Sequence, residues 1–458
     1  MAVPGTINRL KRVPIKQRDS DERKKDFDMY IFPYTREEVM AESDRCLACG
    51  LCVPGCPARV NIPGYVRAMA DGDVEKGINI IFKDLPLPQI CGTVCTHRCE
   101  DACVFHNRGD AVAIRHIKRY IAENSDYTKD VKVNKKPDTG KRVAAIGAGP
   151  ASLTLGYYLA LNGVHVDIYE KHKVAGGMMT IGIPRYRLSM EILNKEIDFI
   201  KSLGVDIKYG VEVGKDISFE ELMEKYDAVF IGVGNHRPRT TGTAGSEKTD
   251  RVMHAIDFLR RVALGEKVDV GEKVIIIGGG FTAMDAARTS LRLGAKKASI
   301  FYRRRFEDRP SAGTSNAEEE YEETAAEGVE FVWTVTPFEY VVENGKLKGM
   351  KYWKNEMVEQ EGGGRAKPVP IKDQEYFVEA DTIIEATGQT IEFSFLPDHI
   401  KEKLEMDWNN IKVDANGMTS IEGVFAGGDA VNPTKDIISA VADGKKAAKG
   451  IIKYLNLQ

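Results

Sequence analysis

Apolar and polar residues follow each other along the chain in patterns that predict a helical segment and two mixed units. Residues 62–82, IPGYVRAMADGDVEKGINIIF, show the three- and four-residue apolar spacing of an amphipathic helix. Residues 141–171 and 272–305 each contain a short apolar run, a glycine turn, a helical pattern and a second apolar run. This order predicts strand, tight turn, helix and strand, as in a parallel α/β sheet. The charged stretch 123–140, rich in turn formers, predicts a linker.

The last part of the chain predicts how these units connect. Residues 380–389 and 421–455 contain two short apolar strands and a final helix, which we interpret as a return to the first unit. The stretch 358–368, VEQEGGGRAKP, predicts a hairpin tip or surface loop. The expected fold class is α/β: a helical N-terminal domain, then two Rossmann-like dinucleotide-binding domains, the second inserted in the first. The expected boundaries are 1–139 for the helical domain, 140–268 with 380–458 for the first nucleotide-binding domain, and 269–379 for the second.

Composition is that of an ordinary globular protein. The chain has 458 residues, more than one core usually contains, with 43% hydrophobic and 29% charged residues and a net charge of −3. This balance gives no argument for binding nucleic acid or a membrane surface. No apolar run is long enough to span a membrane, and MAVPGTINRLKRV lacks the apolar region of a secretory signal. We therefore expect a cytoplasmic protein, in which clustered cysteines more often hold metal than form disulfides.

All eight cysteines lie between residues 46 and 103. The first four follow C-x2-C-x2-C-x3-C with Pro57 next, the run of bacterial ferredoxins, whose spacing lets a short loop wrap an iron–sulfur cluster. The second four are spaced by four residues. Together they supply enough thiolates for two [4Fe–4S] clusters, and zinc, which also suits C-x2-C pairs, is the alternative. The candidate metal ligands are Cys46, Cys49, Cys52, Cys56, Cys91, Cys95, Cys99 and Cys103.

The first glycine turn predicts a pyrophosphate site. Gly147 and Gly149 let the backbone close tightly and approach a phosphate at a helix N-terminus. The third motif position is Ser152 where Gly or Ala is usual, and Glu170 ends the second strand, where a carboxylate can bind ribose hydroxyls. Near the C-terminus, GVFAGGDA places an aspartate where flavoproteins with two dinucleotide domains contact the flavin side chain. The candidate residues in this motif and in EATGQ are Gly428, Asp429 and Gly388.

The second glycine turn predicts an NADPH site. Gly278, Gly280 and Ala283 form G-x-G-x-x-A, and the second strand ends in YRRR instead of an acid. Arg303 and Arg304 stand where a carboxylate would select NADH, and guanidinium groups suit the 2′-phosphate of NADPH. A solvated basic strand end is the alternative. No C-x-x-C lies near either turn, which excludes a redox-active disulfide of the thioredoxin reductase type. No catalytic side chain is predicted, because nicotinamide and flavin carry the chemistry of hydride transfer.

Taken together, these motifs resemble a known family. The cysteine pattern, GAGPAS, GGMMTIGIPRYRLS, GGGFTAMDAARTSLRLGAK, YRRR, EATGQ and AGGDA resemble the small subunit of glutamate synthase. They are similar also to the NADPH-binding subunit of ferredoxin-dependent transhydrogenases and to the N-terminal half of dihydropyrimidine dehydrogenase. The resemblance covers nearly the whole chain. It implies FAD at Gly147, Gly149, Glu170, Gly177, Arg187 and Asp429, and NADPH at Gly280, Thr282, Arg303, Arg304 and Arg309.

The resemblance also implies how the thiolates divide. One cluster would be held by Cys46, Cys49, Cys52 and Cys103, and the other by Cys56, Cys95, Cys99 and a Glu or Gln. The position of that last ligand is Lys118 in this chain, and an ammonium group cannot ligate iron. Cys91 is our first candidate for the missing ligand, and His116 is a weaker one. The gap between the second and third ligands is also shorter than the family often has.

These features predict a subunit that passes electrons between NAD(P)H and a partner subunit through FAD and two [4Fe–4S] clusters, with NADH less favoured than NADPH. The partner expected is a catalytic or second flavoprotein subunit of a heteromeric redox complex, or ferredoxin, as in glutamate synthase or a bifurcating transhydrogenase. Two alternatives stay open. One is a non-catalytic electron-relay or assembly module, which Ser152 and Lys118 favour, and the other is a flavoprotein reductase with structural zinc.

Overall fold

The computed structural model describes residues 9–457. Residues 1–8 and 458 lie outside the described residues, and with them most of the stretch in which the sequence predicts no secretory signal. No helix among residues 9–457 combines the length and apolarity that crossing a membrane would require.

The N-terminal domain is helical, as the sequence predicts. The stretch 62–82 forms two helices instead of one, because Gly72 has a φ of +76° and Asp73 accepts a hydrogen bond from the Lys76 N–H, which starts the second helix. The helices are α1 (Ser20–Arg23), α2 (Arg36–Asp44), α3 (Cys52–Gly55), α4 (Ile62–Ala70), α5 (Val74–Phe82), α6 (Pro88–Val94), α7 (Arg98–Asp101), α8 (Ile114–Glu123) and α9 (Tyr127–Asp130).

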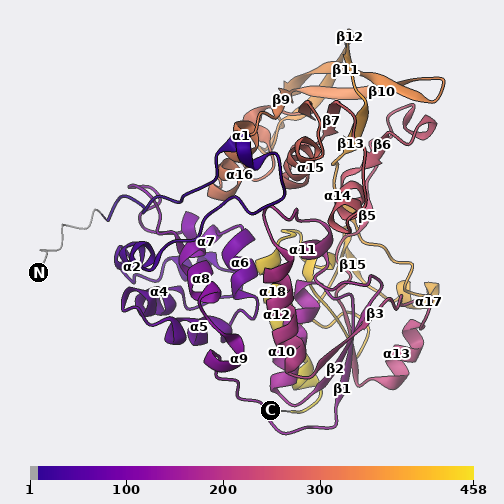
Figure 1. Ribbon diagram of the computed structural model, residues 1–458. Coiled ribbons are helices and arrows are strands. Elements are labelled where there is room, and N and C mark those ends of the chain that lie inside the picture. The colour runs from indigo at the N-terminus through magenta and orange to yellow at the C-terminus, as the bar shows by residue number, and fades with distance from the viewer. Residues whose placement is uncertain (1–8, 458) are drawn as a thin grey trace, which may run out of the picture.

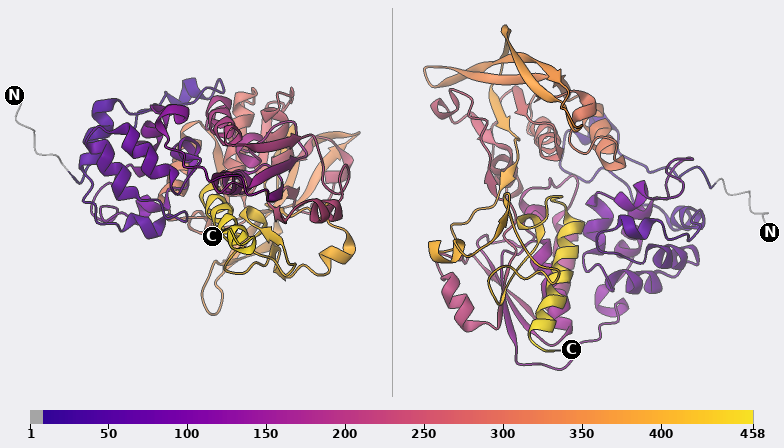
Figure 2. Two further views of the ribbon diagram at one scale, coloured as in Figure 1. Left: turned by 90° about the horizontal axis from the view of Figure 1, so that it is seen from below. Right: turned by 180° about the vertical axis from the view of Figure 1, so that it is seen from behind.

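The first nucleotide-binding domain contains a parallel five-stranded sheet in the order β17-β4-β1-β2-β3. Its strands are β1 (Arg142–Ile146), β2 (His165–Glu170), β3 (Val205–Tyr209), β4 (Ala228–Ile231) and β17 (Val424–Ala426). The final strand and helix do return to this domain, since β17 pairs with β4 and α18 packs beside α10 (Figure 2). The domain's helices are α10 (Pro150–Leu161), α11 (Met178–Ile181), α12 (Met190–Ser202), α13 (Phe219–Lys225), α17 (Asp398–Lys401) and α18 (Ile437–Tyr454), and two short strands, β15 (Met406–Asp407) and β16 (Asn410–Ile411), pair with each other.

The second nucleotide-binding domain is inserted in the first and is wider than the span 269–379. Its parallel sheet has the order β6-β13-β7-β8-β9, in which β6 and β13 lie outside that span on either side. The chain enters and leaves it through a two-stranded ribbon, β5 (Arg237–Pro238) with β14 (Gln389–Thr390). Its other strands are β6 (Val252–His254), β7 (Lys273–Ile277), β8 (Lys297–Tyr302), β9 (Glu330–Trp333) and β13 (Thr382–Glu385), and its helices are α14 (Ala255–Ala263), α15 (Phe281–Arg292) and α16 (Ser315–Ala326).

A three-stranded antiparallel sheet projects from the second domain, at the top of Figure 1. It consists of β10 (Val335–Glu343), β11 (Lys346–Val358) and β12 (Lys367–Glu379). The stretch 358–368 joins β11 to β12, so the predicted hairpin connection is confirmed. This connection turns back toward the end of β8, where Arg304 Nε donates to the Ala366 carbonyl at 3.1 Å.

The N-terminal helical domain shares one hydrophobic core with the first nucleotide-binding domain. Side chains of α5 and α8 belong to the same buried cluster as those of α10, α12 and α18. Members from both domains include Ile81, Ile117, Leu153, Ile197 and Ile451, each at most 5% exposed. These two domains therefore fold as a single packed body.

Buried ion pairs fix the segment around α1 to the inserted domain. Arg23 Nε donates to Glu327 Oε1 at 2.9 Å, and the same carboxylate accepts from Arg288 at 2.7 Å and Arg292 at 2.6 Å. Figure 1 shows α1 beside α15 and α16, far from the other N-terminal helices. Burial alone would raise the pKa of Glu327, but hydrogen bonds from Arg292 and Arg288 lower it to about 2.

Candidate functional site

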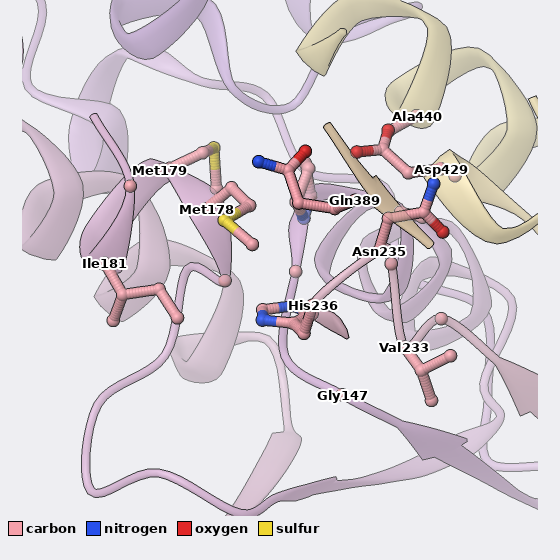
Figure 3. Close-up of a pocket in the computed structure, with 18 of the residues that line it drawn as sticks. Gly147, Met178, Met179, Ile181, Val233, Asn235, His236, Gln389, Asp429 and Ala440 are labelled. Atoms are coloured by element: carbon pink, nitrogen blue, oxygen red, sulfur yellow. The ribbon is translucent and has the colours of Figure 1, made fainter. Parts of the chain in front are cut away.

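One cavity of about 310 Å³ lies where the three domains meet. Its walls contain the first glycine turn, the start of helix α15 through Phe281 and Thr282, and part of the helical domain through Val94 and Thr96. Figure 3 shows Met178, Met179 and Ile181 on one side of it and Asn235 and Asp429 on the other. A mainly apolar cavity with a few polar groups is typical of a cofactor site.

The first turn presents unsatisfied backbone donors to this cavity. α10 begins after Gly149 without a side-chain cap, so its first N–H groups are free to meet a ligand. A Cβ on Gly149 would find no atom closer than 3.9 Å, which leaves room for a phosphate. Gly147 has a φ of +88°, and a Cβ there would lie 2.9 Å from the Gly232 carbonyl oxygen. Gly177, with a φ of +54°, packs its backbone against Gly149 and lines the same cavity.

Ser152 fits its position because its neighbour lacks a side chain. It is completely buried, and a Cβ on Gly232 would lie 2.1 Å from its hydroxyl oxygen. Within the described part of the chain, this hydroxyl has no hydrogen-bond partner. Gly232 therefore gives helix α10 and the sheet the close contact that Gly or Ala provides at this position in the usual motif.

Two predicted carboxylates lie at this cavity. Glu170 Oε2 accepts from the Ala148 N–H and Oε1 from the His172 N–H, both at 2.8 Å, which holds the carboxylate beside the glycine turn. Asp429 follows β17 in the short helix η3 (Gly428–Ala430), and burial raises its pKa to about 6. Gly428 has a φ of +72° and donates its N–H to Asp443 at 3.1 Å. Gly388 also has a positive φ and precedes Gln389, which lines the cavity.

Three polar cavity residues escaped the sequence analysis. Asn235 is 4% exposed, and its side-chain oxygen has no hydrogen-bond partner among residues 9–457. Burial lowers the pKa of His236 to about 4, so its ring is neutral at pH 7. Gln389 lies between the two walls in Figure 3. Asn235 and His236 directly precede β5 and Gln389 begins β14, and no sequence motif marks these positions.

The second turn reaches the same cavity. α15 also begins after a glycine, Gly280, without a side-chain cap, and Thr282 in its first turn lines the cavity. A Cβ on Gly280 would find no atom within 3.9 Å except Pro310 Cγ at that distance. Gly278 has a φ of +150°, and a Cβ there would lie 2.4 Å from the Ala386 carbonyl oxygen, so no larger residue fits.

Basic side chains gather at the end of β8. Arg303 is exposed and Arg304 is half-buried, directly after Tyr302, whose ring lies against the glycine turn. Arg365, from the loop between β11 and β12, donates to the Tyr302 hydroxyl at 2.6 Å. No sequence pattern marks Arg365 as part of this group, because it is 61 residues distant from Arg304 and only the hairpin brings it back.

Two other predicted arginines make internal contacts. Arg187 lines the cavity and forms ion pairs with Asp285 of α15, at 2.9 Å, and with Glu320 of α16. It thereby bridges the two nucleotide-binding domains. Arg309 is 4% exposed, pairs with Glu318 and stacks over the Phe306 ring at 3.8 Å. Their predicted contacts with cofactors stay predictions.

The cysteines form two groups. Cys46, Cys49, Cys52 and Cys103 line one small cavity with apolar walls from Ile62, Val66 and Ile114. This is the division that the resemblance implies for the first cluster. Burial raises the pKa of Cys52 to about 12, and the neighbouring Cys46 and Cys103 act in the same direction. Among residues 9–457, no three His, Cys, Asp or Glu side chains converge as they would around a single metal ion.

The second group, Cys56, Cys91, Cys95 and Cys99, interacts electrostatically with Lys118. Burial works against its charge, but the charges of Cys95, Cys91, Cys99 and Cys56 raise the pKa of Lys118. His116 lies elsewhere, with its ring 5.8 Å from that of Tyr34 and its Nε2 3.3 Å from Arg115. Next to this group, Thr96 donates to Asp436 at 2.9 Å beside the central cavity.

Two family models match the chain. Residues 23–130 match dihydropyrimidine dehydrogenase domain II, 4Fe-4S cluster, and residues 141–444 match pyridine nucleotide-disulphide oxidoreductase. The chain belongs to the pyridine nucleotide-disulphide oxidoreductase family. A glutamate synthase [NADPH] small chain from Escherichia coli is 33% identical over 98% of both chains, so this membership extends to the glutamate synthase small chain family.

Two further matches illustrate a longer relative and a likeness of the fold alone. The NADPH-Fe(3+) oxidoreductase subunit beta of Geobacter sulfurreducens is 37% identical over 88% of this chain, which spans 63% of that relative's length. The solved structure of Mycobacterium tuberculosis FprA in complex with NADPH superposes with a TM-score of 0.57 at 17% identity, covering 70% of this chain and 85% of that one. The family assignment confirms the predicted α/β fold, the resemblance and an oxidoreductase with a 4Fe-4S domain.

Proposed function

We propose that this chain is the FAD- and iron–sulfur-containing subunit of a redox complex that exchanges electrons between NADPH and a partner subunit. The observation that carries this proposal is the convergence of both uncapped helix N-termini and of the cysteine-bearing domain on one cavity. Gly149 and Gly280 would hold the pyrophosphates of FAD and NADPH, respectively. The two thiol groups would each hold a [4Fe–4S] cluster.

The residues present fit these groups. Gly149 and Gly280 both have open space beside them. The buried side-chain oxygen of Asn235 has no hydrogen-bond partner among residues 9–457, and a bound cofactor can supply one. The first thiol group contains four cysteines without a competing carboxylate or imidazole in its cavity wall. The close fit of Ser152 against Gly232 removes one reason to regard the first turn as vestigial.

When bound, NADPH supplies a hydride, FAD takes up two electrons and gives them up singly, and the clusters carry single electrons. Met178, Met179 and Ile181 keep water from one wall of the cavity. Glu170 is positioned to accept hydrogen bonds from ribose hydroxyls, since its backbone contacts use one lone pair on each oxygen. Asp429 lines the cavity, where its carboxylate can accept a hydrogen bond from a hydroxyl of the flavin side chain.

In this proposal, electrons travel from the cavity to the protein surface through both thiol groups. Cys95 precedes Thr96, which lines the cavity, and the short helix α3 joins Cys52 of the first group to Cys56 of the second. Cys49 is exposed, with exposed Leu47 and Leu51 beside it. We infer that a partner subunit approaches the first cluster here, and that the partner's potential sets the direction of electron flow.

Preference for NADPH rests on the arginines at the end of β8. Arg304 and Arg365 are held at the end of β8 by hydrogen bonds to the Ala366 carbonyl and the Tyr302 hydroxyl, and with Arg303 they would supply the guanidinium groups that a 2′-phosphate requires. Loss of one charge-assisted contact costs about 1.5–3 kcal/mol, or roughly 10- to 100-fold in affinity. Arg303→Ala should therefore raise the KM for NADPH and leave that for NADH unchanged. Arg305→Ala is the matched control, because Arg305 is paired with Asp308 and Glu359.

Anaerobic titration of the purified chain with NADPH tests the proposed function. Bleaching of the flavin absorbance, followed by the signal of reduced clusters, is the expected result. A flavin that stays oxidised would favour the electron-relay alternative. Iron and labile sulfide near zero, with stoichiometric zinc, would favour the zinc-containing reductase.

A further inference from the structure

The buried ammonium group of Lys118 lacks a carboxylate partner. Its side chain is 7% exposed on α8, and among residues 9–457 no Asp or Glu forms an ion pair with its ammonium group. The largest charge contributions to its pKa come from four sulfurs, those of Cys95, Cys91, Cys99 and Cys56. A buried cation without an anion costs several kcal/mol, so this arrangement calls for negative charge at the sulfurs.

Neutral thiols do not supply that charge, whereas thiolates bound to iron do. An iron–sulfur cluster held by four thiolates carries a net negative charge in its usual oxidation states. A carboxylate at position 118 would add to that charge, and a lysine offsets it. The replacement of the family's Glu or Gln by Lys118 therefore fits an all-thiolate site better than an incomplete one.

Cys91 is placed to be the fourth thiolate. It is completely buried and unpaired, and its strongest charge partner is Lys118, followed by Cys95. Helices α6 and α8 touch at this point, since a Cβ on Gly92 would lie 2.6 Å from Arg119 Cα. Cys91 directly precedes Gly92 and Lys118 directly precedes Arg119, so this backbone contact holds Cys91 and Lys118 close to each other.

The structure assigns Cys56, Cys91, Cys95 and Cys99 as the ligands of the second [4Fe–4S] cluster, with Lys118 as its counter-ion. This assignment rests on the proposed function, which places a cluster at the second thiol group. Lys118 acts on the cluster through its charge and does not bind iron. Because the reduced cluster has one more negative charge, the ammonium favours reduction.

Iron and sulfide analysis of the anaerobically purified chain tests the ligand set. The wild type should contain about eight irons per chain, and Cys91→Ala about four, the same loss as Cys56→Ala. Thr93→Ala, on the same helix, is the control and should keep eight. Cys91→Ser retains the shape of the side chain in case the alanine variant does not fold, and should change the electron paramagnetic resonance spectrum of one cluster. Eight irons and an unchanged spectrum in the Cys91 variants would overturn the assignment.

A redox titration with dithionite, followed by electron paramagnetic resonance, tests the counter-ion. Lys118→Met should keep eight irons and disfavour reduction of the second cluster at least tenfold, a shift of 59 mV for one electron. Lys118→Arg should preserve the wild-type midpoint. An unchanged midpoint in Lys118→Met would overturn this role. These readouts do not require NADPH, so failure of flavin bleaching and failure of this assignment are separate results.

Discussion

Glu327 is expected to be the single most important side chain for holding the inserted domain against the rest of the molecule. It is 1% exposed and accepts hydrogen bonds from Arg23, Arg288 and Arg292, which are themselves 2%, 0% and 8% exposed. Glu327→Gln removes the negative charge and turns an N–H donor toward guanidinium groups. Breaking a buried ion pair in this way costs about 3–5 kcal/mol.

The pH dependence gives an independent magnitude. The pKa of Glu327 falls from its usual 4.5 to about 2 in the folded protein. The carboxylate therefore stabilises the fold fully above about pH 4.5, and this contribution is lost as the pH falls from 4.5 toward 2. At about 1.4 kcal/mol per pH unit, it amounts to roughly 3 kcal/mol, in line with the cost of the substitution.

Thermal unfolding of the holoprotein at pH 7 measures this effect. Glu327→Gln should lower the midpoint by roughly 6–15 °C, taking 2–3 °C per kcal/mol for a domain of this size. Glu322→Gln is the matched control, since Glu322 is exposed on α16, the helix that ends just before Glu327, and should shift the midpoint by less than about 1 °C. If both variants unfold at the same temperature as the wild type, the ion pairs around Glu327 do not secure this interface.

Three further predictions concern the cofactor sites and the helix that carries Cys91. Arg365→Ala should weaken binding of 2′,5′-ADP roughly tenfold in calorimetry without affecting 5′-AMP, and equal binding of 2′,5′-ADP by both proteins would exclude this contact. FAD release should increase as the pH falls through about 6, because protonation of Asp429 removes an acceptor for the flavin side chain, and fluorescence of released FAD in Asp429→Asn should lose that dependence. Glu196 of α12 accepts from the N–H groups of Gln89 and Ile90 at the start of α6, so Glu196→Ala should cost about 1–3 kcal/mol in urea unfolding. Burial raises the pKa of Glu196 to about 7, so its stabilising contribution is full below pH 4.5 and is lost as the pH rises through 7, a slope that Glu196→Gln should remove.

Local patterns in the sequence predicted the parts of the fold that depend on local chemistry. Both glycine turns are readable because only glycine tolerates a φ of +88° at Gly147 or the approach of the Ala386 carbonyl at Gly278. The spacing of the first cysteine run likewise predicted a short loop, and three of its cysteines, Cys46, Cys49 and Cys52, line one cavity. The insertion of one nucleotide-binding domain in the other followed from the order of these motifs.

Features that depend on contacts between distant segments were not readable. The strands β6 and β13 were not assigned to the inserted domain, because they are short apolar stretches whose sheet is decided by pairing: β13 pairs with β7, and β6 pairs with β13. Arg365 was missed because a hairpin brings it to Tyr302, and Glu327 because its partner Arg23 is 304 residues distant. Which cysteines lie near Lys118 also depends on the packing of α6 against α8, and the spacing of cysteines in the sequence does not reveal that packing.

The continuous core beneath the cysteine-bearing helices limits how this protein can be taken apart. Removing the cysteine-bearing segment at the linker before β1 would expose the apolar faces of α5 and α8. It would also leave the carboxyl group of Glu196 without the backbone N–H groups that donate hydrogen bonds to it. The cysteine-bearing segment is therefore not a detachable electron-transfer cassette, and grafting it onto another reductase would require α10, α12 and α18 to travel with it. Recombination that keeps this core intact has to transfer the cysteine-bearing helices together with α10, α12 and α18.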